Sequence, residues 1–284
     1  MDNTLYDYSP ITERPPIEWP GGKKLAFYVG LNIEHFHIDK PATSSSSVTA
    51  GFVPDPMNHG WRDYGTRVGI WRMMKLFDEV GLRASAITNS EVCTHYPQII
   101  EAAVARNWAW IAHGQTNSIM QANMDEATEV AFLDQLFAHF DAVLPARPKG
   151  WLGPALTETF NTPRLLQERG VQYLLDWNAD DRPFRLNQPG LIEIPYGIDI
   201  NDIQVFVGKA VTGSAYEEMV LDHFEVMLAE GGGVMALPVH PFVVGQPYRF
   251  KHFANVIRTI TSHPDVWVTT TDDIAAHVTP LLPN

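Results

Sequence analysis

Short apolar runs alternate along the chain with longer segments in which apolar residues recur every three to four positions. The short runs predict strands and the longer segments predict helices. Strands are predicted at 24–34, 82–88, 108–112, 171–177, 234–239 and 265–269. Strands that alternate with helices pair in parallel through right-handed crossovers. About seven such units are countable, so we expect an α/β chain with one barrel-like sheet.

The helical segments carry specific expectations about where each helix begins and which face is buried. Helices are predicted to start at Thr66, Pro97, Asp125, Asn161, Ser214, close to residue 250, and at Thr271. The first should bury Val68, Trp71, Met74 and Phe77 and end at Gly81. The helix after Asp125 should bury Leu133, Phe137 and Phe140. Ser214 and Glu217 fit a capping box.

Two segments are expected to lack regular structure. Prolines interrupt residues 1–22, which we interpret as an N-terminal arm, and residues 23–284 are interpreted as a single catalytic domain without a linker or internal repeat. The aromatic residues of the arm predict that it packs onto the domain or onto a neighbouring subunit. Residues 38–62 are predicted to form a long functional or mobile loop.

Polar residues stand where the predicted strands end, and they are the strongest functional signal. The strand ends carry Asn32, Glu34, Asn89, His113, Asp176 and His240. In α/β barrels, the active site is built from side chains at the carboxyl ends of successive strands. The pattern therefore predicts an enzyme.

Composition and charge narrow the class of protein. The chain has 284 residues and a net charge of −13, which argues against nucleic acid and anionic membranes as partners. A single cysteine, Cys93, excludes an internal disulfide. The N-terminal sequence lacks the apolar region of a signal peptide, and no run of about 18 apolar residues predicts a membrane span. We expect a cytoplasmic protein.

His113 and Glu34 are the leading candidates for catalysis. His113 opens the sequence HGQTNS directly after a buried strand, although a core histidine bonded to a backbone carbonyl is the alternative interpretation. Glu34 follows the apolar run LAFYVGL, so it is expected either to be desolvated or to have a cation as partner. Both cases make it a candidate base or ligand. His35 and His37 should lie on the opposite face of the strand.

Further candidates have weaker signals. His240 is a candidate acid, oxyanion stabiliser or substrate donor, with a lone histidine at a strand end as the alternative. Asp180 is a candidate partner for a His or Arg side chain, or part of a solvated turn. Arg67 lies in the first turn of its predicted helix, where a cation opposes the helix dipole, so its guanidinium is expected to bind substrate. The chain has no serine-hydrolase elbow, P-loop or dinucleotide fingerprint.

Motifs along almost the whole chain resemble those of the polysaccharide deacetylase (NodB-homology) superfamily, and they are most similar to its allantoinase-like and cyclic-imide-hydrolase-like branch. The resemblance rests on KKLAFYVGLNIEHF, DYGTRVGIWR, IAHGQTNS, RPKGWLGPALTETFNTP, LLDWNADDRPF, LPVHPFVVGQPYRFKHF and VWVTTTDDIAAH. It implies a distorted (β/α)7-type barrel. It also implies an enzyme that hydrolyses carbon–nitrogen bonds other than peptide bonds.

The resemblance has consequences for metal binding, because the chain departs from the metal-dependent members. Asn32 stands where they have a base, Glu34 where they have a carboxylate ligand, and Asn117 where they have a second histidine ligand. We therefore expect either no tightly bound cofactor or a weakly bound divalent metal, zinc by preference, held by Glu34 and His113. The branch also implies a homodimer or homotetramer.

We expect the reaction to open a small cyclic amide resembling allantoin, an imide or a hydantoin. Glu34 or His113 would be the base, with His240 and Asn32 stabilising the oxyanion. Candidate substrate contacts are Arg67, Asn117, Trp151, Glu158 and Asp180, with Glu158 also a reserve base. The alternatives are an N-deacetylase acting on chitin or peptidoglycan and a catalytically inactive binding relative.

Overall fold

A computed structural model describes residues 2–283. Met1 and Asn284, the outer bounds of the predicted arm and domain, lie outside the described residues. The strands are β1 (Leu25–Ile33), β2 (Ser85–Thr88), β3 (Ala109–Ala112), β4 (Gly150–Trp151), β5 (Tyr173–Leu174), β6 (Phe184–Arg185), β7 (Ile192–Glu193), β8 (Gly233–Val239) and β9 (Val266–Val268). They form one sheet in the order β6-β7-β5-β4-β3-β2-β1-β8, with β9 paired to β1. All pairs are parallel except β6 with β7.

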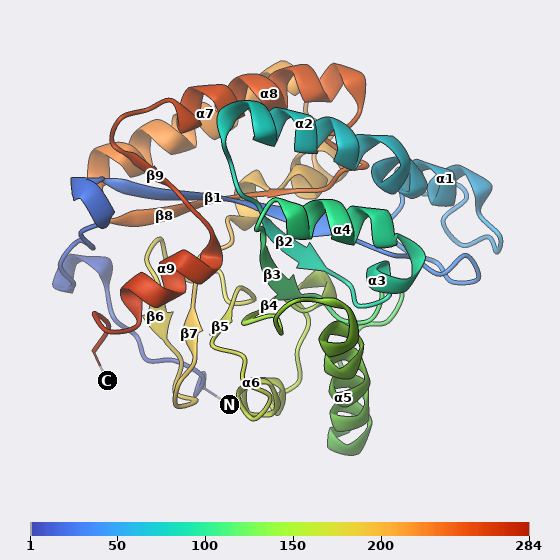
Figure 1. Cartoon of the computed structure of the whole chain (residues 1–284), viewed down its shortest axis with the longest axis horizontal. Helices are drawn as coiled ribbons and strands as arrows, with labels where there is room; N and C mark the ends of the chain where they lie inside the picture. Colours follow the sequence, from blue (N-terminus) through green and yellow to red (C-terminus); the bar gives the residue numbers. More distant parts are fainter. Residues whose placement is uncertain (1, 284) are drawn as a thin grey trace.

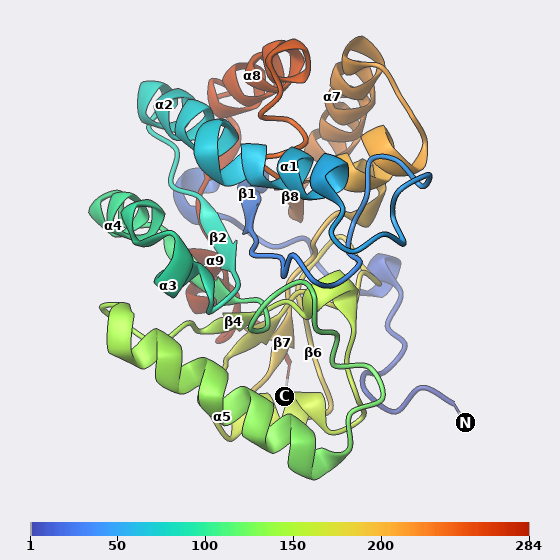
Figure 2. The same ribbon diagram turned by 90° about the vertical axis from the view of Figure 1, so that its right-hand side faces the viewer.

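The sheet curls on itself, and helices cover its outer side. The helices are α1 (Pro56–Tyr64), α2 (Ile70–Val80), α3 (Val92–His95), α4 (Pro97–Ala105), α5 (Glu126–Val143), α6 (Thr162–Gln167), α7 (Gly213–Glu230), α8 (Pro247–Thr261) and α9 (Thr271–Val278). Figure 1 shows α2, α7 and α8 along one side of the strands. Figure 2 shows α3, α4 and α5 continuing the outer layer around the curve. The sheet ends at β6 and β8, so it is the predicted distorted barrel in its open form.

Strand β1 pairs with β2, β8 and β9, and all nine of its residues are buried. Successive residues of a strand point to opposite faces. Phe27 and Leu31 join the apolar cluster beneath the helices, whereas Ala26 and Tyr28 join a second cluster inside the curl of the sheet. Asn32 and Glu34 are in phase with Ala26 and Tyr28. The alternation therefore directs both polar side chains toward the inside of the sheet.

The long helix after Asp125 is confirmed, and the helix predicted from Thr66 is confirmed in part, because Met74 and Phe77 are buried and Gly81 ends α2, but its predicted start is wrong. Asp125 caps α5 through the backbone N–H of Thr128, and Leu133, Phe137 and Phe140 are buried. Thr66 instead lies inside a π-helical turn, Gly65–Gly69, that joins α1 to α2. A π turn inserts an extra residue into the helical repeat and rotates the faces that follow it. As a result Val68 and Trp71 are 38% and 41% exposed.

Part of the predicted loop at 38–62 is helical, because Asp55 caps α1 and Pro56 occupies its first turn. The cap of α7 is Thr212 rather than Ser214, and Glu217 binds His252 instead of closing a capping box. Among residues 2–283, no helix has the length and apolar character needed to cross a membrane.

The arm packs against its own chain. Trp19 is 2% exposed and lies in the inner cluster. Arg14 forms an ion pair with Asp180, and the ring of Tyr6 packs edge-on against Trp177. These contacts place the arm beside the loop that follows β5.

Candidate functional site

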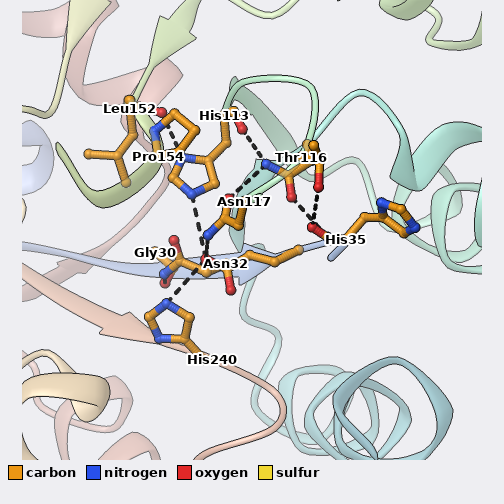
Figure 3. Close-up of polar contacts among 12 residues, drawn as sticks. Gly30, Asn32, His35, His113, Thr116, Asn117, Leu152, Pro154 and His240 are labelled. Carbon is orange, nitrogen blue, oxygen red and sulfur yellow. Dashed lines mark hydrogen bonds and ion pairs between the residues drawn. The ribbon is translucent and has the colours of Figure 1, made fainter. Parts of the chain in front are cut away.

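The buried carboxylate of Glu34 is the centre of the candidate site, just past the end of β1. Its side chain is 3% exposed, and its Oε1 atom lies 3.5 Å from the Nε2 atoms of both His113 and His240. Asn117 Nδ2 donates to the same oxygen at 2.5 Å. Figure 3 shows His113 and His240 approaching the end of β1 from opposite sides. The structure thus brings together the three residues that the sequence predicts at the mouth of the sheet.

The same alternation that directs Glu34 inward also directs the two histidines. In β3, Ile111 belongs to the inner cluster, and His113 is two residues farther along the chain. In β8, Val234 and Ala236 belong to that cluster, and His240 is again in phase with them. Because parallel strands end at one edge of the sheet, these three side chains meet there.

His113 is held in one tautomer by the backbone of the next strand. Its Nδ1 atom lies 2.6 Å from the Leu152 carbonyl oxygen, which accepts but cannot donate, so Nδ1 carries a hydrogen. This contact leaves Nε2 facing Glu34. Gly114 follows with a φ of +64°, and a Cβ atom there would lie 2.6 Å from Pro154. The turn that presents His113 therefore requires glycine.

His240 is held as a cation between two carboxylates. Asp202 accepts a hydrogen bond from the His240 backbone N–H at 2.8 Å and lies 2.6 Å from its Nδ1 atom. Burial lowers the pKa of His240, but Asp202 and Glu34 outweigh that effect and raise it to about 10. A charged ring donates from both nitrogens, so Nε2 presents a hydrogen to Glu34. As in a catalytic triad, a buried carboxylate, here Asp202, fixes the orientation of the histidine and stabilises its charge.

The sequence analysis missed Asp202. It is fully buried and stands in the segment that precedes a π-helical turn, Ile203–Gly208, where no strand pattern leads to it. It is also 38 residues before His240 in the chain. The one available signal was a pair of acids, Asp199 and Asp202, in an otherwise apolar stretch.

The carboxylate of Glu34 stays ionised in spite of its burial. Burial raises its pKa, but the charge of His240 and the close contacts with His113 and His240 lower it to about 2. Its second oxygen, Oε2, is buried and has no hydrogen-bond partner. An unpartnered buried acceptor is costly, so Oε2 is the natural position for a polar group of a ligand or for a water.

Asn32 and Asn117 support the site in different ways. Asn32 Nδ2 donates to Tyr196 Oη at 2.8 Å and also lies within reach of the Gly30 and Val239 carbonyls. Its amide hydrogens are thus occupied, so the predicted oxyanion role for Asn32 needs a change in these bonds. Asn117 is fixed by Asn89, which donates to its Oδ1 atom at 2.9 Å. That contact turns the N–H groups of Asn117 toward Glu34.

Glu158 and Asp176 line a cavity of about 640 Å³ beside the ends of β4 and β5. Burial raises the pKa of Glu158 to about 7, and burial together with Glu158 raises that of Asp176 well above its usual value. Glu158 Oε1 and Asp176 Oδ2 have no hydrogen-bond partners. The space beside Glu34 itself is only about 10 Å³ and is lined in part by Arg62 of α1.

Three predicted substrate contacts lie elsewhere. Arg67 is exposed on the π turn, and Arg62, one turn earlier, lines the space beside Glu34. Trp151 is fully buried in the cluster under the helices, because the alternation of β4 directs Leu152 inward instead, so a substrate contact for Trp151 is wrong. The Asp180 carboxylate is engaged by Arg14 of the arm.

The residues around Glu34 do not fit a metal site well. Asn117 directs an N–H group at Glu34 Oε1, and His240 directs a positive charge at it, where a cation would have to bind. Glu34 and His113 remain as two ligands, fewer than the three or four that hold zinc. Within residues 2–283, the ligand atoms of one His/Glu group do lie within 4.8 Å of one another, and that possible metal site is His35, Glu91 and His95.

Comparisons with known proteins agree with the sequence motifs. No model of a protein family matches the chain. A candidate polysaccharide deacetylase of Schizosaccharomyces pombe is 23% identical over an alignment that covers 90% of this chain and 91% of that protein. The crystal structure of Puue allantoinase is 27% identical, with a TM-score of 0.86 and coverage of 97% and 98% of the two chains. A probable polysaccharide deacetylase from Pseudomonas aeruginosa PAO1 is 25% identical, with a TM-score of 0.85 and coverage of 94% and 95%.

These similarities extend over nearly the full length of the chain and include the fold. The comparisons confirm the resemblance found in the sequence: the chain has the fold of the polysaccharide deacetylase superfamily and is a hydrolase that acts on carbon–nitrogen bonds other than peptide bonds.

Proposed function

We propose that the protein opens the ring of a small cyclic amide, resembling allantoin, an imide or a hydantoin. The observation that carries this proposal is the buried Glu34 carboxylate, which has one free oxygen and a cationic His240 on its other side. The similarity to Puue allantoinase supports the same substrate class. The space beside Glu34 and Arg62 is about 10 Å³, which has room for a water but not for a cyclic amide, so the proposal requires Arg62 and α1 to move aside when the substrate binds.

In the proposed reaction, a water bound to Glu34 Oε2 attacks the ring carbonyl carbon. Glu34 takes one proton of the water as the carbon–oxygen bond forms, and the carbonyl oxygen becomes an oxyanion. The Nε2–H group of His240 stabilises that oxyanion. The carbon–nitrogen bond then breaks, and Glu34 gives its proton to the leaving nitrogen. Water and amide thus yield an N–H group and a carboxylic acid, which releases its proton to the solvent at neutral pH.

Substrate binding also adjusts the strength of Glu34 as a base. In the free protein, His240 holds the pKa of Glu34 near 2, which is low for a base at neutral pH. When the substrate carbonyl accepts the hydrogen of His240 Nε2, Glu34 loses that contact. Its burial then raises the pKa toward neutrality. His113 Nε2 lies 3.5 Å away and is the second candidate base, able to share the same proton.

No step of this reaction uses a metal ion. Zinc at Glu34 and His113 is expected to bind weakly and with partial occupancy, because Asn117 and His240 oppose it. Extensive treatment with a chelator should therefore leave the ring-opening rate unchanged. Stoichiometric zinc that survives chelation and depends on His113 would contradict this part of the proposal.

The alternative is N-deacetylation of a carbohydrate, which the names of the relatives from S. pombe and P. aeruginosa favour. The chemistry of amide hydrolysis is the same, but a glycan chain needs an open groove at the reacting carboxylate. The experiment is a substrate panel containing allantoin, hydantoin and succinimide beside N-acetylglucosamine oligomers and peptidoglycan fragments. We expect ring opening of at least one cyclic amide. Release of acetate from the oligomers without turnover of any cyclic amide would establish the deacetylase instead.

A further inference from the structure

A histidine-rich groove lies on the other side of the motif that carries Glu34. His35 follows Glu34 directly, and in an extended segment it points the opposite way. Figure 3 shows its ring directed away from the end of β1 where His113 and His240 meet. Glu91 comes from the turn between β2 and α3, and His95 ends α3. None of these three side chains takes part in the proposed hydrolysis.

The ligand atoms of these residues lie near one another, and the His95 ring, which stacks on that of His35, has to turn for both nitrogens to face one ion. One ligand atom from each of His35, Glu91 and His95 lies within 4.8 Å of the others. Glu91 Oε2 is 2.9 Å from His35 Nδ1 and 2.9 Å from His37 Nε2. The contact with His35 is not aligned for a hydrogen bond, so His35 Nδ1 is a buried nitrogen without a partner. This nitrogen lies beside the Glu91 carboxylate, and a bound metal ion or a proton would give it the partner it lacks.

The groove is open to ions from solution. It has a volume of about 740 Å³ and is lined by further imidazoles, among them His59 and His139. His95 is exposed, so its ring can turn to shorten the ligand distances. The net charge of −13 attracts cations to the surface in general.

We propose that His35, Glu91 and His95 bind one divalent transition-metal ion, with Zn²⁺ as the preferred ion. Two imidazoles and a carboxylate are a ligand set that zinc accepts, with water or His37 in the fourth position. Magnesium and calcium prefer oxygen ligands and should not compete. This site is separate from Glu34 and His113, and the proposal does not depend on the substrate of the enzyme.

The ion would join segments that shape the catalytic site. The His35 carbonyl accepts from the backbone N–H of Asn117 at 3.0 Å, and the backbone N–H of Glu91 donates to Gln115 at 3.1 Å. The loop that presents Asn117 to Glu34 is thus held by the two segments that supply the first two ligands. Binding of the ion to the folded state alone would raise the melting temperature.

The test is zinc binding to the chelator-treated full-length protein, measured by calorimetry and by the melting temperature. The variants are His95→Ala and Glu91→Gln. Controls are His139→Ala, a half-buried histidine of the same groove, and His113→Ala, which removes the ligand nearest Glu34. We expect one equivalent of zinc in the wild type and both controls, and affinity at least about tenfold lower in the two site variants.

The proposal would be overturned by no zinc binding in the wild type, by unchanged binding in His95→Ala and Glu91→Gln, or by loss of the ion in His113→Ala alone. Binding of Co²⁺ provides an independent readout, because its visible spectrum reports the ligand set whether or not the enzyme is active. Equal stabilisation by Mg²⁺ would also contradict a site built on imidazoles.

Discussion

Replacement of Asp202 by asparagine tests whether the buried charge on His240 is set by its neighbour. Asp202 is fully buried and holds both the ring and the backbone N–H of His240. The rise of the His240 pKa from 6.5 to about 10 corresponds to roughly 5 kcal/mol in favour of the charged ring. Asp202 makes the largest contribution to the rise of the His240 pKa, so Asp202→Asn should remove about 2–3 kcal/mol of this stabilisation of the charged ring.

The loss of unfolding free energy in Asp202→Asn should depend on pH. A histidine whose pKa is raised on folding contributes stability that is fully present below its unfolded value, near 6.5, and that disappears as the pH rises through about 10. The difference in unfolding free energy between wild type and Asp202→Asn should therefore be largest at pH 6 and smaller at pH 9. Urea denaturation at both pH values measures it.

Activity should fall as well, because an amide at position 202 neither fixes the His240 ring nor stabilises its positive charge as Asp202 does. We expect kcat to decrease by about a hundredfold or more at pH 7. Asp180→Asn, which removes a carboxylate paired with Arg14 near the surface, is the matched control and should retain kcat. A stability difference that grows from pH 6 to pH 9, or an Asp202→Asn variant with wild-type kcat, would refute the electrostatic argument.

Three further predictions concern other parts of the chain. Glu158→Gln should be more stable than wild type by about 2 kcal/mol at pH 8, but not at pH 4. The reason is that a carboxyl group with a raised pKa lowers the stability of the folded state as the pH rises from 4.5 through about 7. Urea titrations at both pH values test this. Gly69→Ala should cost about 1–3 kcal/mol, because its Cβ atom would lie 2.0 Å from the Pro241 carbonyl oxygen; Gly60→Ala has open space and is the control in thermal melts. Light scattering should show a dimer or tetramer, and a monomer of 31.8 kDa at micromolar concentration would contradict that prediction.

The alternation of polar and apolar positions was sufficient to predict the core of the site. Glu34, His113 and His240 each follow a buried strand. Side chains of a strand alternate between its two faces, and each of the three lies an even number of positions from residues that face inward. Because the strands are parallel, the three side chains meet at one edge of the sheet. The fold was predictable for the same reason, since apolar strands and helices alternate along almost the whole chain.

What the sequence did not reveal depends on loops and on distant contacts. Asp202 reaches His240 from an irregular segment, and no periodic pattern relates the two residues. Arg62 lies beside Glu34, rather than Arg67, because a π turn changes the helical phase between α1 and α2. A one-residue change of phase cannot be detected from apolar spacing in so short a segment. Trp151 was predicted to contact the substrate because it lies at a strand end. The sequence did not reveal which face of β4 its side chain occupies.

The most direct test of the account compares the turnover numbers of Glu34→Gln and Glu158→Gln on a cyclic amide that the wild type opens. Both substitutions keep the size of a carboxyl side chain and remove its charge, and circular dichroism checks that each variant is folded. We predict that Glu34→Gln loses at least about a hundredfold in kcat, whereas Glu158→Gln loses less than about tenfold. Wild-type turnover by Glu34→Gln, together with an inactive Glu158→Gln, would contradict the assignment of Glu34 as the catalytic carboxylate.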